Sequence, residues 1–176
     1  GIFGEWQSDL SRRLSLRTRL IVDKVDYNLP EYRGYNADNY GASLRLTYGI
    51  NNRSYLSLSG FWLYEDSSTD WNSNMRQRYG LGYGMELPLG FNIYAEPNIT
   101  WVNYQEGRNF ISKNSTLEWL KRRDTTYGVY VTLSNKYLRI YDITPTVSYI
   151  YNKRFSNVNN YDYARTRWEI GISKSF

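Results

Sequence analysis

Hydrophobic and polar residues alternate with a period of two along most of this chain. In the segment 40–50, for example, Tyr40, Leu44 and Tyr48 fall in one phase, and Arg45 and Thr47 fall in the other. Successive side chains of a strand point to opposite faces, so the alternation predicts strands with one apolar and one polar face. The same reading predicts at least eight strands, over residues 11–24, 40–50, 56–65, 78–89, 91–101, 127–134, 142–151 and 165–176.

The connections between these segments alternate between long and short. Short turns are expected at 51–53, 88–90 and 135–136, and longer loops at 25–39, 66–74, 106–124 and 152–160. Short periplasmic turns and longer extracellular loops are typical of outer-membrane barrels. We therefore predict an all-β fold, an antiparallel transmembrane β-barrel in a bacterial outer membrane. An even number of strands would place both chain ends on the periplasmic side.

The aromatic content changes how the low hydropathy is interpreted. Mean hydropathy is −0.66, and the chain has no apolar run near the roughly 20 residues of a membrane helix. Yet 18% of the residues are aromatic, including 19 Tyr and 6 Trp. A barrel reconciles these facts, because only its outward face meets lipid. The predicted outward aromatics near the loop ends resemble a membrane-interface belt. They are Tyr40, Trp62, Tyr64, Tyr79, Trp101, Tyr127, Tyr149, Tyr151 and Trp168.

The chain contains no His and no Cys. Ser-His and Cys-His catalysis, thiolate chemistry and most zinc sites therefore have no side chains to use. We expect a protein that is not an enzyme and that binds no cofactor and no metal. The net charge of +5 is modest, and we expect lipids of the outer membrane, not nucleic acid, as its surroundings.

Charged residues gather on the polar faces of the predicted strands. The predicted lumen-facing charges are Arg17, Arg19, Arg45, Arg78, Glu86, Glu96, Arg165, Arg167 and Glu169. In a closed eight-stranded barrel these side chains would fill the interior as ion pairs. In a wider barrel they would line a wet, slightly basic lumen, and the excess of arginine would guide an anionic or polar passenger.

The segment 106–124 has two interpretations. It contains Leu117, Trp119 and Leu120 beside Arg122 and Arg123. As an extracellular loop, this apolar and basic cluster would contact lipid headgroups or a partner protein. As an ordinary extension of the flanking strands, it would carry no separate function.

The C-terminal residues resemble the signal by which barrels are recognised for membrane insertion. The signal residues are Glu169, Gly171, Ile172 and the terminal Phe176, in alternation. Lys174 departs from the usual pattern, since an apolar residue is common there. The resemblance implies the barrel-assembly machinery as a partner.

A longer set of motifs resembles the surface lipoprotein assembly modifier (Slam) family over about residues 79–176. The matching residues are Leu87-Pro88-Leu89-Gly90, Tyr104, Arg123-Asp124, Ile143-Thr144-Pro145, Phe155-Ser156-Asn157, Tyr161-Asp162-Tyr163-Ala164-Arg165 and Phe176. The resemblance implies a C-terminal barrel that follows a periplasmic helical-repeat domain. It also implies delivery of lipoproteins or small secreted proteins to the cell surface.

These observations favour one domain over residues 1–176, interpreted as the C-terminal part of a larger protein, since the family's barrel has more strands. The preferred function is the barrel of a Slam-like translocator. Two alternatives remain open at this point, a passive porin for small anionic solutes and a small structural or adhesive eight-stranded barrel.

Overall fold

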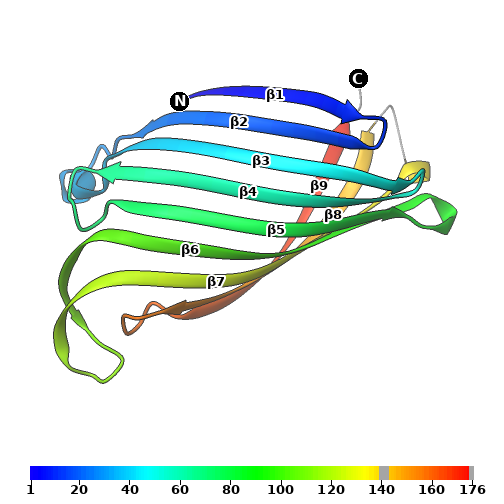
Figure 1. Ribbon diagram of the computed structural model, residues 1–176. Helices are drawn as coiled ribbons and strands as arrows, with labels where there is room; N and C mark the ends of the chain where they lie inside the picture. The colour runs from blue at the N-terminus through cyan, green and yellow to red at the C-terminus, as the bar shows by residue number, and fades with distance from the viewer. Residues whose placement is uncertain (139–142, 175–176) are drawn as a thin grey trace.

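The fold is one antiparallel sheet in which each strand pairs with the next along the chain (Figure 1). A computed structural model describes residues 1–138 and 143–174, and nine strands lie in this part. They are β1 (Ile2–Ser11), β2 (Leu14–Val25), β3 (Ala37–Asn51), β4 (Ser54–Ser67), β5 (Asn74–Glu86), β6 (Phe91–Ile111), β7 (Leu117–Asn135), β8 (Ile143–Ser156) and β9 (Tyr163–Lys174). The predicted all-β class and antiparallel order are confirmed.

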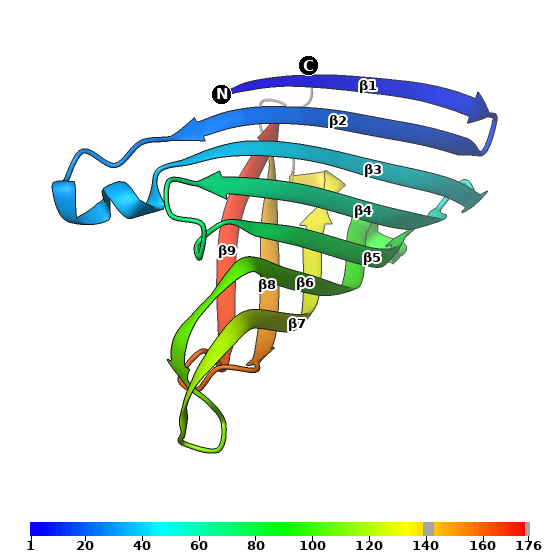
Figure 2. The same cartoon turned by 60° about the vertical axis from the view of Figure 1, so that its left-hand side comes forward.

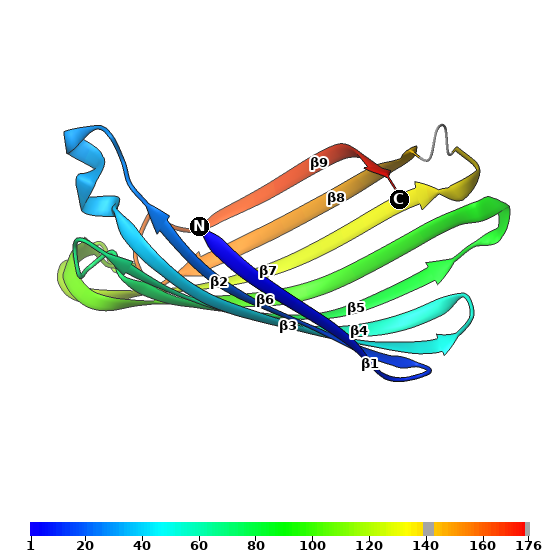
Figure 3. The same ribbon diagram turned by 90° about the horizontal axis from the view of Figure 1, so that it is seen from above.

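The sheet curves into a deep trough. Strands β8 and β9 pass behind β2–β5 in Figure 1 and cross behind β3–β5 again in Figure 2, and the view from above shows both walls (Figure 3). In the described part of the chain β1 and β9 form the two edges of the sheet, and neither pairs with the other. The trough thus has a convex face, a concave face and two open edges.

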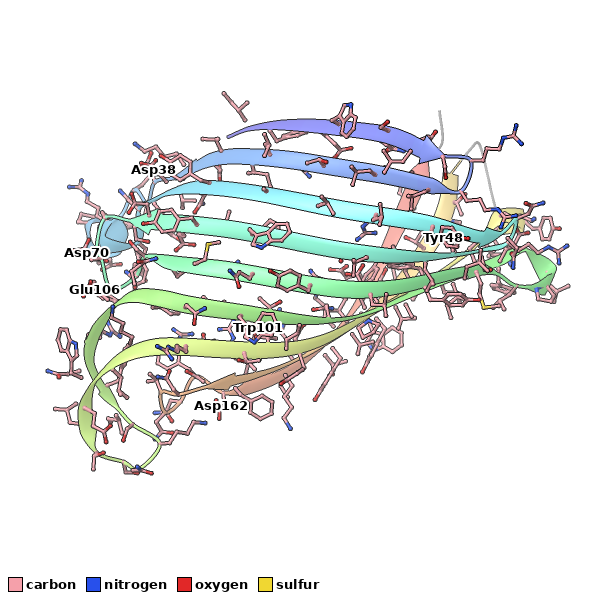
Figure 4. The ribbon with its side chains drawn as sticks, viewed as in Figure 1. Asp38, Tyr48, Asp70, Trp101, Glu106 and Asp162 are labelled. Atoms are coloured by element: carbon pink, nitrogen blue, oxygen red, sulfur yellow. The ribbon has the colours of Figure 1, made fainter. Side chains whose placement is uncertain are left out.

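The strand connections divide the sheet into two ends. Two-residue turns join β1 to β2 and β3 to β4, and the short helix η2 (Pro88–Gly90) joins β5 to β6. Longer connections at the other end include η1 (Pro30–Tyr35) between β2 and β3. Asp38 and Asp70 mark this long-connection end in Figure 4, and Tyr48 lies toward the opposite end. No helix in the described ranges is long and apolar enough to cross a membrane.

The strand β1 was not predicted from the sequence. Its convex positions alternate Ile2, Trp6 and Leu10 with Gly4 and Ser8, so its apolar period is weak. The predicted strand 11–24 corresponds to β2, which begins after the turn. The extra strand also corrects the predicted position of the N-terminus. Pairing with β2 places the N-terminal end of β1 at the long-connection end.

Two predicted loops are largely strand. The segment 106–124 is the end of a long hairpin, in which β6 reaches Ile111 and β7 begins at Leu117. The strand-extension interpretation of this segment is therefore correct. The loop predicted at 152–160 also begins later than expected, because β8 continues to Ser156.

The register separates an apolar face from a polar face. One row of paired positions on the convex face is Leu16, Leu46, Leu58 and Leu81, from β2 to β5. The neighbouring row on the opposite face is Arg17, Arg45, Ser59, Gly80, Asn98, Gly128, Asn152 and Arg165, from β2 to β9. Leu58 and Leu81 are more than half exposed, at 54% and 57%, so leucines in the middle of the convex face are open to the surroundings.

The convex face also carries aromatic contacts across strands. Trp62 and Tyr79 meet edge to face at 5.7 Å, and the Trp62 indole N–H donates to the Tyr79 hydroxyl at 3.0 Å. Tyr79 continues the contact to Trp101, again at 5.7 Å between ring centroids. Such pairs stabilise a sheet beyond their buried area. Three of the predicted outward aromatics, Trp62, Tyr79 and Trp101, therefore form cross-strand contacts on this face.

Candidate functional site

The candidate site is an open cavity of about 750 Å³ on the concave face. Its lining comes from strands on both walls of the trough, from β1 and β2 through to β8 and β9. The charged residues that line it are Glu5, Arg17, Arg19, Arg45, Arg76, Arg78, Glu96 and Arg154. Six arginines against two glutamates give this cavity a clear excess of positive charge.

Glu96 on β6 is the central anion of the concave face. Its residue is only 3% exposed, and its two carboxylate oxygens each accept a hydrogen bond from an arginine. Arg45 reaches Oε2 and Arg78 reaches Oε1, both at 3.2 Å. The Tyr94 hydroxyl donates to Oε2 as well, and the Ser57 and Tyr94 hydroxyl oxygens lie 2.9 Å apart. A buried carboxylate requires such partners, because burial without them would destabilise its charged form.

Glycines on β5 provide the space for this network. A Cβ atom at Gly80 would lie 2.8 Å from Glu96 Oε1, and one at Gly84 would lie 2.3 Å from the Tyr55 ring. The concave positions 80, 82 and 84 of β5 are all glycine. Absence of side chains on β5 therefore lets larger side chains from β4 and β6 lie across it.

Arg17 and Arg45 are direct cross-strand partners on β2 and β3. Like charges in this position repel, so each requires its own anionic or polar partner. Arg45 has Glu96. Arg17 donates two hydrogen bonds to the Gln7 side chain, at 2.8 and 3.2 Å, and lies 3.7 Å from Glu5. The unpredicted strand β1 thus supplies the partners of Arg17.

A second buried carboxylate lies nearer the long connections. Asp124 on β7 is 2% exposed and pairs with Arg122 at 2.5 Å and with Arg154 at 3.5 Å. The Arg122 guanidinium also stacks on two rings, 4.7 Å from the Tyr104 centroid and 3.7 Å from the Tyr161 centroid. These contacts fix the hairpin of β6 and β7 to the connection between β8 and β9.

Other predicted site residues share the concave face but lie away from this network. Glu86 pairs with Lys136 at the short-turn end, and Arg167 pairs with Glu169 at 2.8 Å on the edge strand β9. Arg165 lies on the same strand, opposite Asn152. The structure therefore brings Arg17, Arg19, Arg45, Arg78 and Glu96 together in the cavity and leaves Glu86, Arg165, Arg167 and Glu169 outside its lining.

The predicted insertion signal falls on β9. Gly171 pairs with Thr146 and Ile172 pairs with Pro145 on β8, and Ile172 is 75% exposed. Phe176 lies outside the described residues. Among the residues described, no group of three or more acidic side chains is placed to hold a metal ion.

Three charged cavity residues were missed from the sequence. Arg76 precedes the strand predicted at 78–89, Arg154 fell in a predicted loop, and Glu5 lies on the unpredicted strand β1. The first two were detectable, because Arg76 has the phase of Arg78, and Arg154 has the phase of Asn152. Extending the period-two pattern by two residues before position 78 and by three residues after position 151 would have included both.

A curved antiparallel sheet with an apolar convex face and a charged concave face has the architecture of a β-barrel wall. The family model described as "Surface lipoprotein assembly modifier" matches residues 1–176. The chain belongs to this family. The resemblance seen from about residue 79 onward is thus confirmed and extends over the whole chain.

Two curated relatives carry the family name. The chain is 27% identical over 171 residues to Surface lipoprotein assembly modifier 1 of Haemophilus influenzae, with 96% of this chain and 34% of the relative covered. It is 25% identical over 170 residues to the Surface lipoprotein assembly modifier of Pasteurella multocida, with 95% and 33% covered. The chain therefore spans about a third of the length of these relatives.

Among solved structures, the siderophore receptor PirA from Acinetobacter baumannii is similar. The TM-score is 0.47 at 14% sequence identity, and the similarity covers 85% of this chain and 27% of the receptor chain.

Proposed function

We propose that this chain forms part of the wall of an outer-membrane β-barrel that delivers lipoproteins or small secreted proteins to the cell surface. Family membership supports a role in surface lipoprotein assembly. The observation that carries the proposal is the opposite character of the two faces, with leucines exposed on the convex face and arginines lining the concave face. In this proposal the convex face contacts the lipids of the bacterial outer membrane, and the concave face contacts the passenger.

The open edges are consistent with a wall that continues. Unpaired backbone N–H and C=O groups cost several kcal/mol each in lipid, so β1 and β9 need further strands as neighbours in a membrane. Such strands would come from the same protein or from another chain. We propose a barrel wider than eight strands, with a wet lumen, and insertion by the barrel-assembly machinery through the signal on β9. The proposed role includes no catalytic step.

A photo-crosslinking experiment tests the proposed conduit. Thr100 lines the cavity, and the next residue, Trp101, points to the convex face. A benzophenone amino acid placed at each position in turn gives two matched probes one residue apart. Illumination of cells during surface delivery of a lipoprotein should give a protein–lipoprotein adduct from position 100 and none from position 101.

An adduct from position 101 alone would contradict the proposed role of the concave face. A steady anion-selective conductance in a planar bilayer, without any adduct from position 100, would instead support a passive porin.

A further inference from the structure

The arginines of the cavity are not all paired. Arg45 and Arg78 pair with Glu96. Arg17 contacts Gln7 and Glu5, and Arg154 contacts Asp124. Among residues 1–138 and 143–174, Arg19 and Arg76 have no ion pair. Within the described part of the chain, two guanidinium groups of the cavity therefore have no carboxylate partner.

Arg19 is also short of a hydrogen-bond acceptor. Its guanidinium lies 4.2 Å above the Phe3 ring, and its Nε is buried with no hydrogen-bond partner among the described residues. A buried N–H of a charged group that lacks an acceptor is destabilising. The terminal nitrogens of the Arg19 guanidinium group are the atoms that can meet an anion, because guanidinium groups donate to carboxylate and phosphate oxygens in matched pairs.

The positions of the two arginines in the sheet give the separation of their backbones. Arg19 lies on β2 and Arg76 on β5, three strands apart and displaced by two residues along the sheet. Strand spacing of about 4.8 Å and a rise of about 3.3 Å per residue place their backbones about 16 Å apart along the sheet. An extended polypeptide with carboxylates four residues apart spans about 13 Å, a length comparable with this separation, so it can present one carboxylate to each arginine.

We propose that Arg19 and Arg76 form a binding site for an acidic segment of an extended polypeptide, which passes over the concave face in contact with both guanidinium groups. This inference rests on the proposed function, since it names the chemistry of the passenger segment that the concave face recognises. Arg45 and Arg78 contribute long-range attraction, while Glu96 keeps them from binding the segment directly.

The test measures peptide binding to the full-length protein, purified in a zwitterionic detergent. The probe is a fluorescent twelve-residue peptide of Ser and Gly with Glu at every fourth position, and its control carries Gln in place of Glu. Fluorescence anisotropy should show binding of the Glu peptide that weakens with added salt. The Gln peptide should bind at least about tenfold more weakly, since each charge-assisted hydrogen bond contributes roughly a tenfold factor.

Variants then locate the site. Arg19→Gln with Arg76→Gln should weaken binding of the Glu peptide about tenfold or more, and Arg19→Lys with Arg76→Lys should restore part of it. Arg12→Gln with Arg13→Gln, in the exposed turn between β1 and β2, removes the same charge outside the cavity and should leave binding unchanged. Arg76→Gln alone keeps the Arg19–Phe3 contact, so its weaker binding would not reflect a folding defect of β1.

Three results would overturn the proposal. The first is equal affinity for the Glu and Gln peptides. The second is an equal loss of affinity for the Glu peptide in the turn variant and in the cavity variant. The third is complete displacement of the Glu peptide by an equal concentration of pyrophosphate. The last result would identify a phosphate-type ligand. Peptide binding as expected without a lipoprotein adduct at position 100 would contradict the conduit role and leave the binding site standing. An adduct without peptide binding would contradict this inference alone.

Discussion

Gly82 on β5 and the Tyr94 hydroxyl on β6 are so close that a Cβ atom at position 82 would lie 2.2 Å from the hydroxyl oxygen. The same Cβ would lie 2.3 Å from Ser57 Oγ. Tyr94 donates to Glu96, which in turn holds Arg45 and Arg78. A missing side chain on one strand is therefore a condition for the polar network across three others.

Substitution of Gly82 tests this relationship. Gly82→Ala should destabilise the fold by about 1–3 kcal/mol, because the added methyl group displaces Tyr94 or Ser57 from a well-packed position. Gly4→Ala is the matched control, since a Cβ at Gly4 meets nothing within 4 Å. Urea unfolding in detergent, followed by tryptophan fluorescence, measures both. Equal stability of the two variants would contradict the close contact at position 82.

Glu96→Gln should destabilise the fold by about 1–3 kcal/mol. The substitution leaves Arg45 and Arg78 without their carboxylate, and the effect should fall below that of a fully buried pair, because both arginine side chains are 44% exposed. Glu169→Gln removes a carboxylate from an exposed pair with Arg167 and should change stability by less than about 1 kcal/mol. The same unfolding assay compares them, and a larger loss from Glu169→Gln would refute the central role of Glu96.

A charge placed on each face tests the proposed membrane contact. Leu46→Arg on the convex face should cost about 2–4 kcal/mol if that position lies near the middle of a bilayer. Thr47→Arg, one residue along β3, points to the concave face and should cost much less. Folding yields and urea stability in lipid vesicles measure the difference. Similar tolerance at both positions would be incompatible with a lipid-facing convex surface.

The connection between β8 and β9 should respond to acid. The hydrogen bond from Lys113 and that from the backbone N–H of Ser156 hold the pKa of Asp162 below its ordinary value of 3.8. A carboxyl group with a lowered pKa stabilises the folded loop above its unfolded pKa, and this contribution is lost as the pH falls through the folded value. The loop should therefore loosen only at a pH below 3.8.

Carbon-13 NMR titration of the Asp162 carboxyl group measures this pKa directly. The hydrogen-exchange protection factor of the Ser156 amide, relative to an unstructured amide at the same pH, should fall over the same acidic range. The reason is that this amide donates to Asp162 at 2.6 Å. In Asp162→Asn the exchange should show no such transition. A titration midpoint at or above 3.8 would contradict the contacts with Lys113 and Ser156.

The sequence alone determined the fold class and the assignment of residues to faces. Arg17, Arg45 and Glu96 were predicted to share a polar face because alternation with a period of two fixes side-chain direction within each strand. It also predicted the Leu46 and Leu58 face as apolar. The family resemblance came from local motifs in the last hundred residues and needed no tertiary information.

Only the tertiary structure decided which charges meet. Arg45 and Glu96 are 51 residues apart in sequence, and their pairing depends on the stagger of β3 to β6 and on the glycines of β5 that leave room between them. Strand β1 could not be predicted from alternation, because Gly4 and Ser8 weaken its apolar phase. Its pairing with β2 in the structure shows that it is a strand. Alternation is a property of one strand, whereas register and curvature arise from how strands pair. The same pairing places Arg19 and Arg76 in the cavity without an ion pair among the described residues.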